Sequence, residues 1–418
     1  MLSVTFKIFC SIILQRMTAA LDTGLRREQH GFRAGRSCVD LINTVRIIIE
    51  QSAEYQSPLW LLFIDFEKAF DSVNRENIWA ILYNRGTPRK IVNLIKEGYR
   101  GYKCRVKQGT KLSEEFETKT GVKQGCILSP LLFAITLDEI MRNAIKGNKR
   151  GIGWTLNESL EDLEFADDIC LLSHRKSHLQ QKVTDVQIQA RKVGLKINGS
   201  KTKAMAINIR GATNITVDEE NIEMVEEFTY LGATVARENG VQRDVVKRIG
   251  KARSVFVRLN KTWRTRNIRE DTKIKIFKSM VKPVLLYGSE SWTITEETRK
   301  KLQVFINRCL RSILGIFWPE TMTNEELWKR AKEEKIEIQI RRRKLRWIGH
   351  TLRKEKEEIP RRVLQWNPQG TRGRGRPCET WRRSIYKETN MTWRQMGTIA
   401  QNRQEWKQLV STLCPEKE

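Results

Sequence analysis

The chain has 418 residues, enough for two or three hydrophobic cores. Lys and Arg together number 77 and Asp and Glu 49, so the formal net charge is +28 at pH 7. So large a basic excess opposes compaction by self-repulsion unless an anionic partner offsets it. Because the basic residues are spread along the chain and are not confined to one amphipathic helix, nucleic acid is favoured over an acidic membrane surface as that partner.

Cysteine spacing and the first residues limit the other classes of protein. The eight cysteines include no C-x-x-C pair, which gives no support to a zinc ribbon or a thioredoxin-like site and fits a reduced, intracellular protein. Residues 2–14 are mainly apolar, with Lys7 as an interruption, and are too few to span a bilayer. Leu2, Phe6, Phe9, Ile13 and Met17 recur at helical spacing, so we expect a helix with one buried face; a signal peptide is the alternative.

The first part of the chain alternates between strand and helix patterns. In chain order, the patterns predict a buried strand (59–64), two helices (77–83 and 90–97), two strands (102–106 and 115–119), a long helix capped by Ser129 (129–145), two strands around an acidic turn (163–165 and 169–172), a helix that stops at Gly194 (180–193) and two further strands (203–208 and 228–231). Strands that pair through hairpins among helices indicate an α+β fold and not a doubly wound parallel sheet.

From about residue 241 onward, helical periodicity dominates and strand patterns nearly vanish. One helix face is predicted to carry Val245, Ile249, Ala252, Phe256 and Leu259. Further on, Lys and Arg crowd around tryptophans between residues 341 and 383. The run Arg341, Arg342, Arg343 and Lys344 would bind phosphate without reading sequence, and the tryptophans would stack on unpaired bases or, more commonly, fill a core.

Two short acidic elements follow apolar runs. Asp65 stands at the end of the strand predicted at 59–64, and Asp167 and Asp168 occupy the turn between two strands. Carboxylates at the end of a buried strand are costly unless something neutralises them, and a divalent metal does so directly. Mg²⁺ prefers oxygen ligands, and two such ions about 4 Å apart can clamp an in-line phosphoryl displacement. An acidic pair alone is usually a solvated turn, so the order of the motifs decides between the two readings.

Between the acidic elements, residues 121–130 form a glycine-bracketed loop that leads into the long helix. Gln124 and Gly125 lie in this loop, and a loop of this kind can bring backbone close to a planar ligand. The N-terminus of the helix favours anionic groups nearby. Taken alone, such a junction is an ordinary connection between a loop and a helix.

Taken in order, these motifs resemble the reverse transcriptases of non-long-terminal-repeat retrotransposons. The matching segments are Gln-His-Gly-Phe-Arg-Ala-Gly-Arg-Ser (29–37), the acidic segment 65–71, the loop 124–130, Phe-Ala-Asp-Asp (165–168), Gly-Leu-Lys-Ile-Asn with Lys-Thr-Lys (194–203) and Phe-Thr-Tyr-Leu-Gly (228–232). The resemblance covers roughly residues 7–232. It implies a right-hand polymerase with fingers and palm (1–236), an all-helical thumb-like region (237–330) and a basic, helical C-terminal region (331–418).

The resemblance also implies roles for single residues. Asp65, Asp167 and Asp168 would hold two Mg²⁺ ions, with Mn²⁺ as an alternative. The incoming nucleotide would meet Arg33 at its triphosphate and Phe70 as a steric gate beneath the sugar. Gln124 and Gly125 would border the nucleotide and the template, and Lys201 would be the proton donor to pyrophosphate, with Lys203 as the competing candidate. Tyr230, Leu231 and Gly232 would support the primer end.

The implied partners are an RNA template, a DNA primer and deoxynucleoside triphosphates, without a membrane. Relatives usually carry an endonuclease domain ahead of the polymerase, and here the first finger motif looks cut short. We therefore carry two alternatives: an inactive retrotransposon remnant that only binds nucleic acid, and an intron-encoded reverse transcriptase of similar palm architecture. The Phe-Ala-Asp-Asp motif and the long helical tail favour the retrotransposon type over the intron-encoded type.

Overall fold

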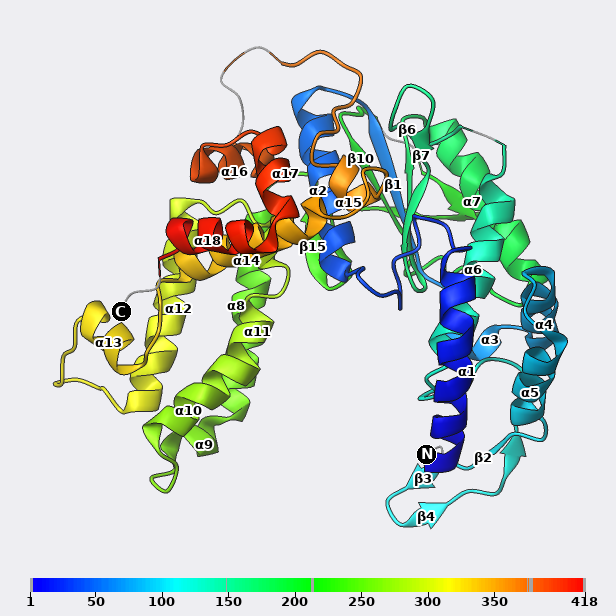
Figure 1. The fold of residues 1–418 in the computed structure, drawn as a ribbon, viewed down its shortest axis with the longest axis horizontal. Coiled ribbons are helices and arrows are strands. Elements are labelled where there is room, and N and C mark those ends of the chain that lie inside the picture. Colours follow the sequence, from blue (N-terminus) through cyan, green and yellow to red (C-terminus); the bar gives the residue numbers. More distant parts are fainter. Residues whose placement is uncertain (1–2, 148, 212–213, 374, 376–378, 416–418) are drawn as a thin grey trace. The chain divides into compact units, whose positions relative to one another are not determined.

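The computed structural model describes residues 3–147, 149–211, 214–373, 375 and 379–415 (Figure 1). The chain divides into two compact units, each with its own hydrophobic core. Unit 1 consists of Met1–Leu41, Tyr55–Val225 and Pro368–Thr371. Unit 2 consists of Ile42–Glu54, Glu226–Asn367 and Arg372–Glu418.

Unit 1 is built on a five-stranded sheet in the order β13-β10-β1-β9-β8. The central strand β1 (Leu59–Ile64) is buried along its whole length and pairs antiparallel with β9 and β10. An all-apolar run suits this position, since both faces of the strand are covered. The remaining strands are β8 (Asp162–Phe165), β9 (Asp168–Ser173), β10 (Lys203–Ile207) and β13 (Glu223–Met224).

Helices cover this sheet: α7 packs on β1 and β9, and α6 packs against α7 (Figure 1). The helices of unit 1 are α1 (Val4–Asp22), α3 (Ala69–Ser72), α4 (Arg75–Asn84), α5 (Arg89–Tyr99), α6 (Ser129–Ile145) and α7 (Lys176–Lys192). Four two-stranded sheets complete it: β2 (Lys103–Cys104) with β5 (Phe116–Glu117), β3 (Lys107–Gln108) with β4 (Lys111–Leu112), β6 (Ile152–Gly153) with β7 (Ser159–Leu160) and β11 (Thr216–Val217) with β12 (Glu220–Asn221).

The first helix is longer than the sequence pattern suggested. Helix α1 has 19 residues and buries Cys10, Ile13, Met17 and Leu21, so the predicted one-sided burial is confirmed, although Leu2 lies outside the described residues. The apolar segment 2–14 is by itself too short to span a bilayer, but the helix continues through Gln15 to Asp22. By length and hydropathy it is one candidate span among the described residues, a property that core helices and signal sequences share.

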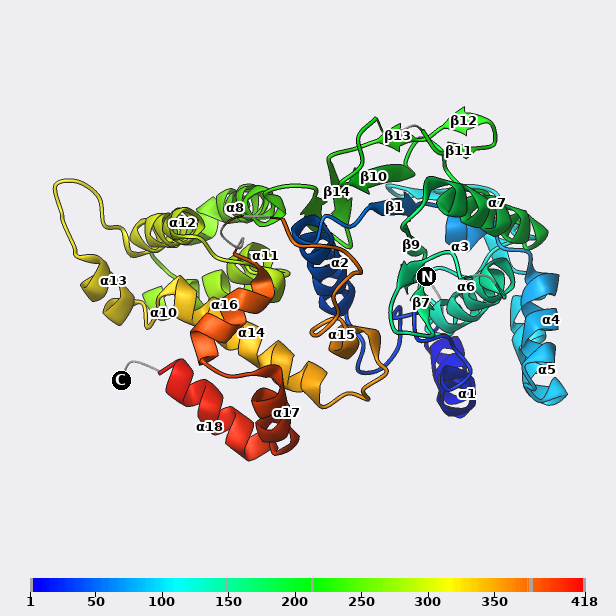
Figure 2. The ribbon, with the colours of Figure 1, turned by 90° about the horizontal axis from the view of Figure 1, so that it is seen from above.

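Unit 2 contains one β-hairpin, and its other described elements are helices. Helices α8 and α12 pack side by side around its core (Figure 2). Helix α2 (Cys38–Glu54) contributes most of its length to this unit. The other elements are β14 (Glu227–Tyr230), β15 (Ala233–Ala236), α8 (Gly240–Arg258), α9 (Asn260–Arg264), α10 (Glu270–Ile276), the π-helix η1 (Phe277–Val281), α11 (Lys282–Leu285), the 3₁₀-helix η2 (Ser289–Ser291), α12 (Glu296–Leu314), α13 (Asn324–Arg330), α14 (Ile336–Leu352), α15 (Ile359–Arg362), α16 (Trp381–Thr389), α17 (Trp393–Gln401) and α18 (Arg403–Leu413).

The predicted α+β class is confirmed, and most predicted elements are present with ends shifted by a few residues. One local prediction was wrong. Ser129 does not cap the long helix but is its first residue, and its hydroxyl donates to the Lys123 carbonyl oxygen at 2.8 Å. Leu128 occupies the cap position, so Ser129 instead holds the preceding loop against the helix.

Candidate active site

The register of the sheet brings the three predicted metal ligands to one edge. Strand β1 pairs with β9 so that Ile64 faces Ile169, and the next positions along the two strands are Asp65 and Asp168. The β8–β9 hairpin pairs Phe165 with Asp168, which leaves Ala166 and Asp167 as its two-residue turn. One acid directly follows β1, and the other two lie at the β8–β9 turn. The pairing of these strands therefore brings the three carboxylates together at one end of the sheet.

The electrostatics of this edge confirm that the acids lie within reach of one another. Partial burial raises the pKa of the Asp168 carboxyl to about 6, and the negative charges of Asp167 and Asp65 add to that rise. Burial and Asp65 likewise raise the pKa of Asp167. Three carboxylates that repel one another favour a cation between them.

The acidic edge could hold a metal ion as an open site, in which the protein supplies only some of the ligands. Among the described residues, no group of three or more His, Cys, Asp and Glu side chains is gathered into a complete ligand set. Mg²⁺ does not need one, because it commonly binds one or two carboxylates and takes its other ligands from water and substrate phosphates. Asp65 Oδ2 is buried and accepts no hydrogen bond within the described chain. An acidic edge with such an oxygen fits divalent cations.

The segment after α7 fixes the backbone beside Asp65. The Asp65 carbonyl oxygen accepts from Asn198 N at 2.8 Å, and its amide donates to the Thr202 hydroxyl at 3.3 Å. The Asn198 side chain in turn accepts from the Lys201 amide at 3.2 Å and closes a tight turn. The motif at 194–203 therefore lies directly alongside the first acidic residue.

The same turn distinguishes the two candidate lysines. Lys201 Nζ lies 3.6 Å from Asp65 Oδ2, and its side chain is 68% exposed. Lys203 Nζ instead donates to the Ser200 carbonyl oxygen and to Glu223, both at 2.6 Å. Only the Lys201 ammonium faces the acidic edge, which favours it over Lys203 as a proton donor there.

Phe70, Gln124 and Gly125 also come together. The Val122 amide donates to the Phe70 carbonyl oxygen at 2.8 Å, and the Phe70 ring stacks on Phe133 of α6 with 4.4 Å between centroids. Gln124 Nε2 donates to the Asp71 carboxylate at 3.1 Å, and Asp71 lies within α3 and does not cap it. Gly125 has a φ of +80° and open space where a side chain would point. The loop thus places an exposed amide and bare backbone next to the aromatic ring.

Arg33 lies in the finger motif, but its guanidinium is engaged by the protein. Nε donates to Asp22 Oδ1 at 2.7 Å, and the other nitrogens donate to the carbonyl oxygens of Arg26, Gln29 and Asp22. The side chain is 8% exposed. A role in gripping a triphosphate stays a prediction, and it requires some of these bonds to be exchanged.

The predicted primer-supporting residues form a tight turn in unit 2. Strand β14 ends at Tyr230, which is buried, and Leu231 and Gly232 make the two-residue turn with φ values of +47° and +79°. The Tyr287 hydroxyl donates to the Leu231 carbonyl oxygen at 2.8 Å, and Arg248 donates to that of Gly232. The turn is therefore held from outside by two polar side chains.

The basic run on α14 is committed to ion pairs. Arg341 pairs with Glu337 and Glu388, Arg342 with Glu334, and Arg343 with Glu290. The side chain of Lys344 is 1% exposed and lies 3.1 Å from Glu388. The predicted phosphate contact by these four residues stays a prediction, and in this arrangement it is open only to the three partly exposed arginines.

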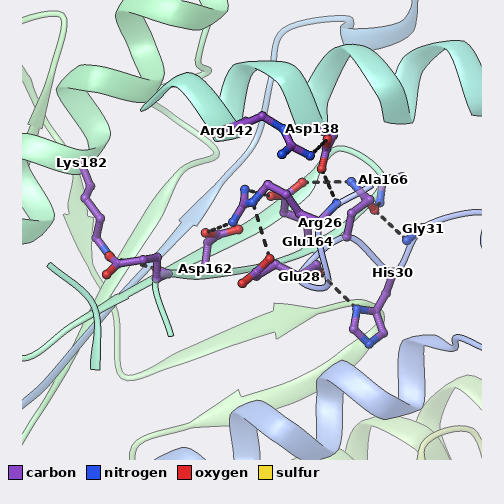
Figure 3. Close-up of polar contacts among 12 residues, drawn as sticks. Arg26, Glu28, His30, Gly31, Asp138, Arg142, Asp162, Glu164, Ala166 and Lys182 are labelled. Carbon is purple, nitrogen blue, oxygen red and sulfur yellow. Dashed lines mark hydrogen bonds and ion pairs between the residues drawn. The ribbon is translucent and has the colours of Figure 1, made fainter. Parts of the chain in front are cut away.

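Sequence reasoning missed a buried polar network that adjoins the acidic turn (Figure 3). Arg26 pairs with Asp162 at 2.6 Å and with Glu164 at 2.8 Å, and both acids are buried on β8. Burial raises the pKa of Glu164 well above its usual range, and the Arg26 charge opposes that rise. The Arg26 amide donates to Asp138 of α6, which also accepts from Arg85 and Arg142. The network anchors β8 to the finger motif and to α6.

Comparisons with known proteins agree with this arrangement. The family model for reverse transcriptase (RNA-dependent DNA polymerase) matches residues 1–235, which is more than half of the chain. The chain belongs to the reverse transcriptase family. The retrotransposon resemblance and the right-hand α+β fold predicted from the motifs are thereby confirmed. Members of this family act on a nucleic-acid template and use divalent metal ions.

Similar proteins come from mobile elements. A transposon-derived protein of Caenorhabditis elegans is 26% identical over 59% of this reverse transcriptase and 94% of its own length. The Pol polyprotein of the type-2 retrotransposable element of Drosophila melanogaster is 24% identical over 73% of this chain, and the RNA-directed DNA polymerase from mobile element jockey of Drosophila funebris is 26% identical over 75%. The chain spans 30% and 35% of the length of these last two relatives.

Among solved structures, telomerase from Candida tropicalis in complex with a fragment of telomeric RNA is similar. The alignment covers 98% of this chain and 56% of telomerase, at 15% identity and a TM-score of 0.44.

Proposed function

We propose that this reverse transcriptase is an active polymerase that adds deoxynucleotides to a primer 3′-hydroxyl on an RNA template. The observation that supports this most strongly is the convergence of Asp65, Asp167 and Asp168 at one sheet edge, where burial, with added repulsion from neighbouring carboxylates, raises the pKa values of Asp167 and Asp168. Crowded carboxylates at the end of a buried strand are typical of a phosphoryl-transfer centre.

The three aspartates would hold two Mg²⁺ ions, with Mn²⁺ as an alternative. When bound, the ions would activate the primer hydroxyl and neutralise the charge that develops on the leaving pyrophosphate. Lys201 would then give a proton to the pyrophosphate oxygen, since its exposed ammonium already faces Asp65. The remaining work of the protein is positioning, because the cations that the carboxylates would hold supply the positive charge.

The nucleotide would lie between the Phe70 ring and the loop that carries Gln124 and Gly125. A ring beneath the sugar would clash with a 2′-hydroxyl and so favour deoxynucleotides. The open space at Gly125 lets base or template approach the backbone. Arg33 would reach the triphosphate only after releasing some of its present hydrogen bonds. Tyr230, Leu231 and Gly232 would support the primer end with their rigid turn.

The deciding experiment is extension of a DNA primer on an RNA template at varied Mg²⁺ concentration. The unsubstituted chain should extend the primer, and Asp65→Ala and Asp167→Asn should each reduce extension by at least about 10²-fold, since each removes a carboxylate that would hold the cations that stabilise the transition state. Ser173→Ala, at the far end of β9, is the matched control and should extend normally. Near-normal extension by Asp167→Asn would contradict the metal assignment.

A folded chain that binds template but does not extend the primer would support the alternative function, an inactive nucleic-acid-binding remnant. The intracellular location stays a prediction.

A further inference from the structure

Gln29 lies fully buried at the junction between the finger motif and the acidic turn. Its side-chain oxygen accepts from the Gly31 amide at 2.7 Å and from the Ala166 amide at 3.2 Å. Its side-chain nitrogen donates to Glu164 Oε2 at 3.0 Å. Two backbone donors require an acceptor and the Glu164 carboxyl oxygen suits a donor, so the network fixes the orientation of the amide group.

Gly31 brings the finger motif into direct contact with the same turn. A Cβ atom at residue 31 would lie 2.2 Å from Ala166 N, so only glycine allows the two backbones to approach this closely. Figure 3 shows Gly31 beside Ala166, with Glu164 and Arg26 next to them. The backbones are also paired, because the His30 amide donates to the Glu164 carbonyl oxygen and the Glu164 amide donates to that of Glu28.

The contact falls on the residue that immediately precedes the predicted metal ligands. Ala166 has a φ of +55°, a left-handed conformation that residues with a side chain rarely adopt. It immediately precedes Asp167 and, with Asp167, forms the turn before Asp168. Strained backbone persists only where surrounding contacts impose it. Within the described chain, the Ala166 amide is held by the Gln29 oxygen and faced by Gly31.

We propose that Gln29 is a positioning residue for the metal-binding turn: its side chain, together with Gly31, holds Ala166 in the left-handed conformation that aims Asp167 and Asp168 at the cations. This inference rests on the proposed function. Groups that orient metal ligands without touching the metal typically change metal affinity by about 10- to 100-fold when they are removed.

The test measures Mn²⁺ binding by the full chain, from the electron paramagnetic resonance signal of free Mn²⁺, without any polymerase assay. Asp167→Asn defines the binding that belongs to the acidic edge. Gln29→Ala and Gln29→Met should weaken that binding about 10-fold while RNA affinity stays within about twofold. Gln29→Met fills nearly the same volume but forms no side-chain hydrogen bonds, so it provides the comparison if Gln29→Ala does not fold.

Ser173→Ala is the matched control for general destabilisation. Ser173 is also buried on β9, and its hydroxyl donates to the Arg150 carbonyl oxygen and accepts from the Arg175 amide, but it lies at the opposite end of the strand. Its loss should lower the unfolding temperature and leave Mn²⁺ binding unchanged. Unchanged Mn²⁺ binding in Gln29→Met, or an equal loss in Ser173→Ala, would overturn the inference. Absence of Mn²⁺ binding in the unsubstituted chain would instead overturn the proposed function.

Discussion

The Lys201 ammonium lies 3.6 Å from the Asp65 carboxylate, across a turn that also hydrogen-bonds the Asp65 backbone. The lysine comes from the segment after α7 and the aspartate from the end of β1. One short turn therefore places a predicted metal ligand and an exposed ammonium group at the same sheet edge. Lys203, two residues further on, is the first residue of strand β10, and its ammonium pairs with the Glu223 carboxylate.

This difference predicts opposite effects for the two lysines. Lys201→Ala should lower the rate of nucleotide addition by about 10²-fold, the usual contribution of a positioned general acid, and leave template affinity unchanged. Lys203→Ala should lower stability because it removes the Glu223 pair, and it should leave the rate nearly unchanged. Single-turnover extension and thermal unfolding of both variants measure the two effects. Equal rates in the two variants would remove Lys201 from the chemistry.

The Phe70 ring is expected to discriminate against ribonucleotides. Phe70→Leu keeps an apolar side chain against the core and removes the planar ring, so the preference for deoxynucleotides over ribonucleotides should fall at least about 10-fold. Phe133→Leu removes the ring on which Phe70 stacks and should reduce stability without changing that preference as much. The ratio of kcat/KM for the two nucleotides in each variant is the measurement. An unchanged ratio in Phe70→Leu would make Phe70 a core residue only.

Sequence patterns were sufficient for the acidic edge because its parts are local. The apolar run of β1 and the two short runs around Asp167 are each long enough to identify a strand, and the acids directly adjoin them. The order of the motifs then identified the family. Helical periodicity likewise identified the face of α8 that carries Val245 and Ala252.

The remainder depends on contacts between residues far apart in the chain. Strand β8 has the sequence Asp-Leu-Glu-Phe, an alternation that normally indicates one solvated face. Asp162 and Glu164 are nevertheless fully buried, because Arg26 binds both of them. Arg26 precedes them in the chain by 136 and 138 residues. Arg33 looks like a free surface cation until Asp22 is seen beside it. The assignment of Ile42–Glu54 to the second unit also has no local pattern.

The basic run on α14 should separate into two kinds of residue. Arg341 and Arg343 are partly exposed, so replacing both with Ala should flatten the salt dependence of RNA binding by about two units of slope if each contacts a phosphate. Lys344→Met should leave the slope unchanged and destabilise unit 2 by about 3 kcal/mol, because it leaves Glu388 buried with a weaker partner. Binding titrations at several salt concentrations and urea unfolding test both statements. An unchanged slope in the double arginine variant would confine this run to a structural role.

Glu50, on the part of α2 that belongs to unit 2, predicts a pH-dependent stability. Burial raises the pKa of its carboxyl from 4.5 to about 7, and the charges of Arg46, Lys344 and Arg382 only partly oppose the rise. Its oxygen accepts from the Trp381 amide at 2.9 Å, a bond that a neutral carboxyl group retains. The folded chain therefore keeps this proton over a pH range in which the unfolded chain releases it.

The sign of the effect follows directly. Between pH 4.5 and about 7 the folded state binds more protons than the unfolded state, so the contribution of Glu50 to stability falls as pH rises and levels off above pH 7. A fully shielded group with this shift would contribute about 3 kcal/mol, and Glu50 keeps some contact with solvent, so we expect about 2 kcal/mol. Glu50→Gln should be more stable than the unsubstituted chain by that amount at pH 8 and equal to it near pH 4.5. Urea unfolding of both proteins across this range provides the comparison, and parallel curves would show that the Glu50 carboxylate ionises in the folded chain as readily as in the unfolded one.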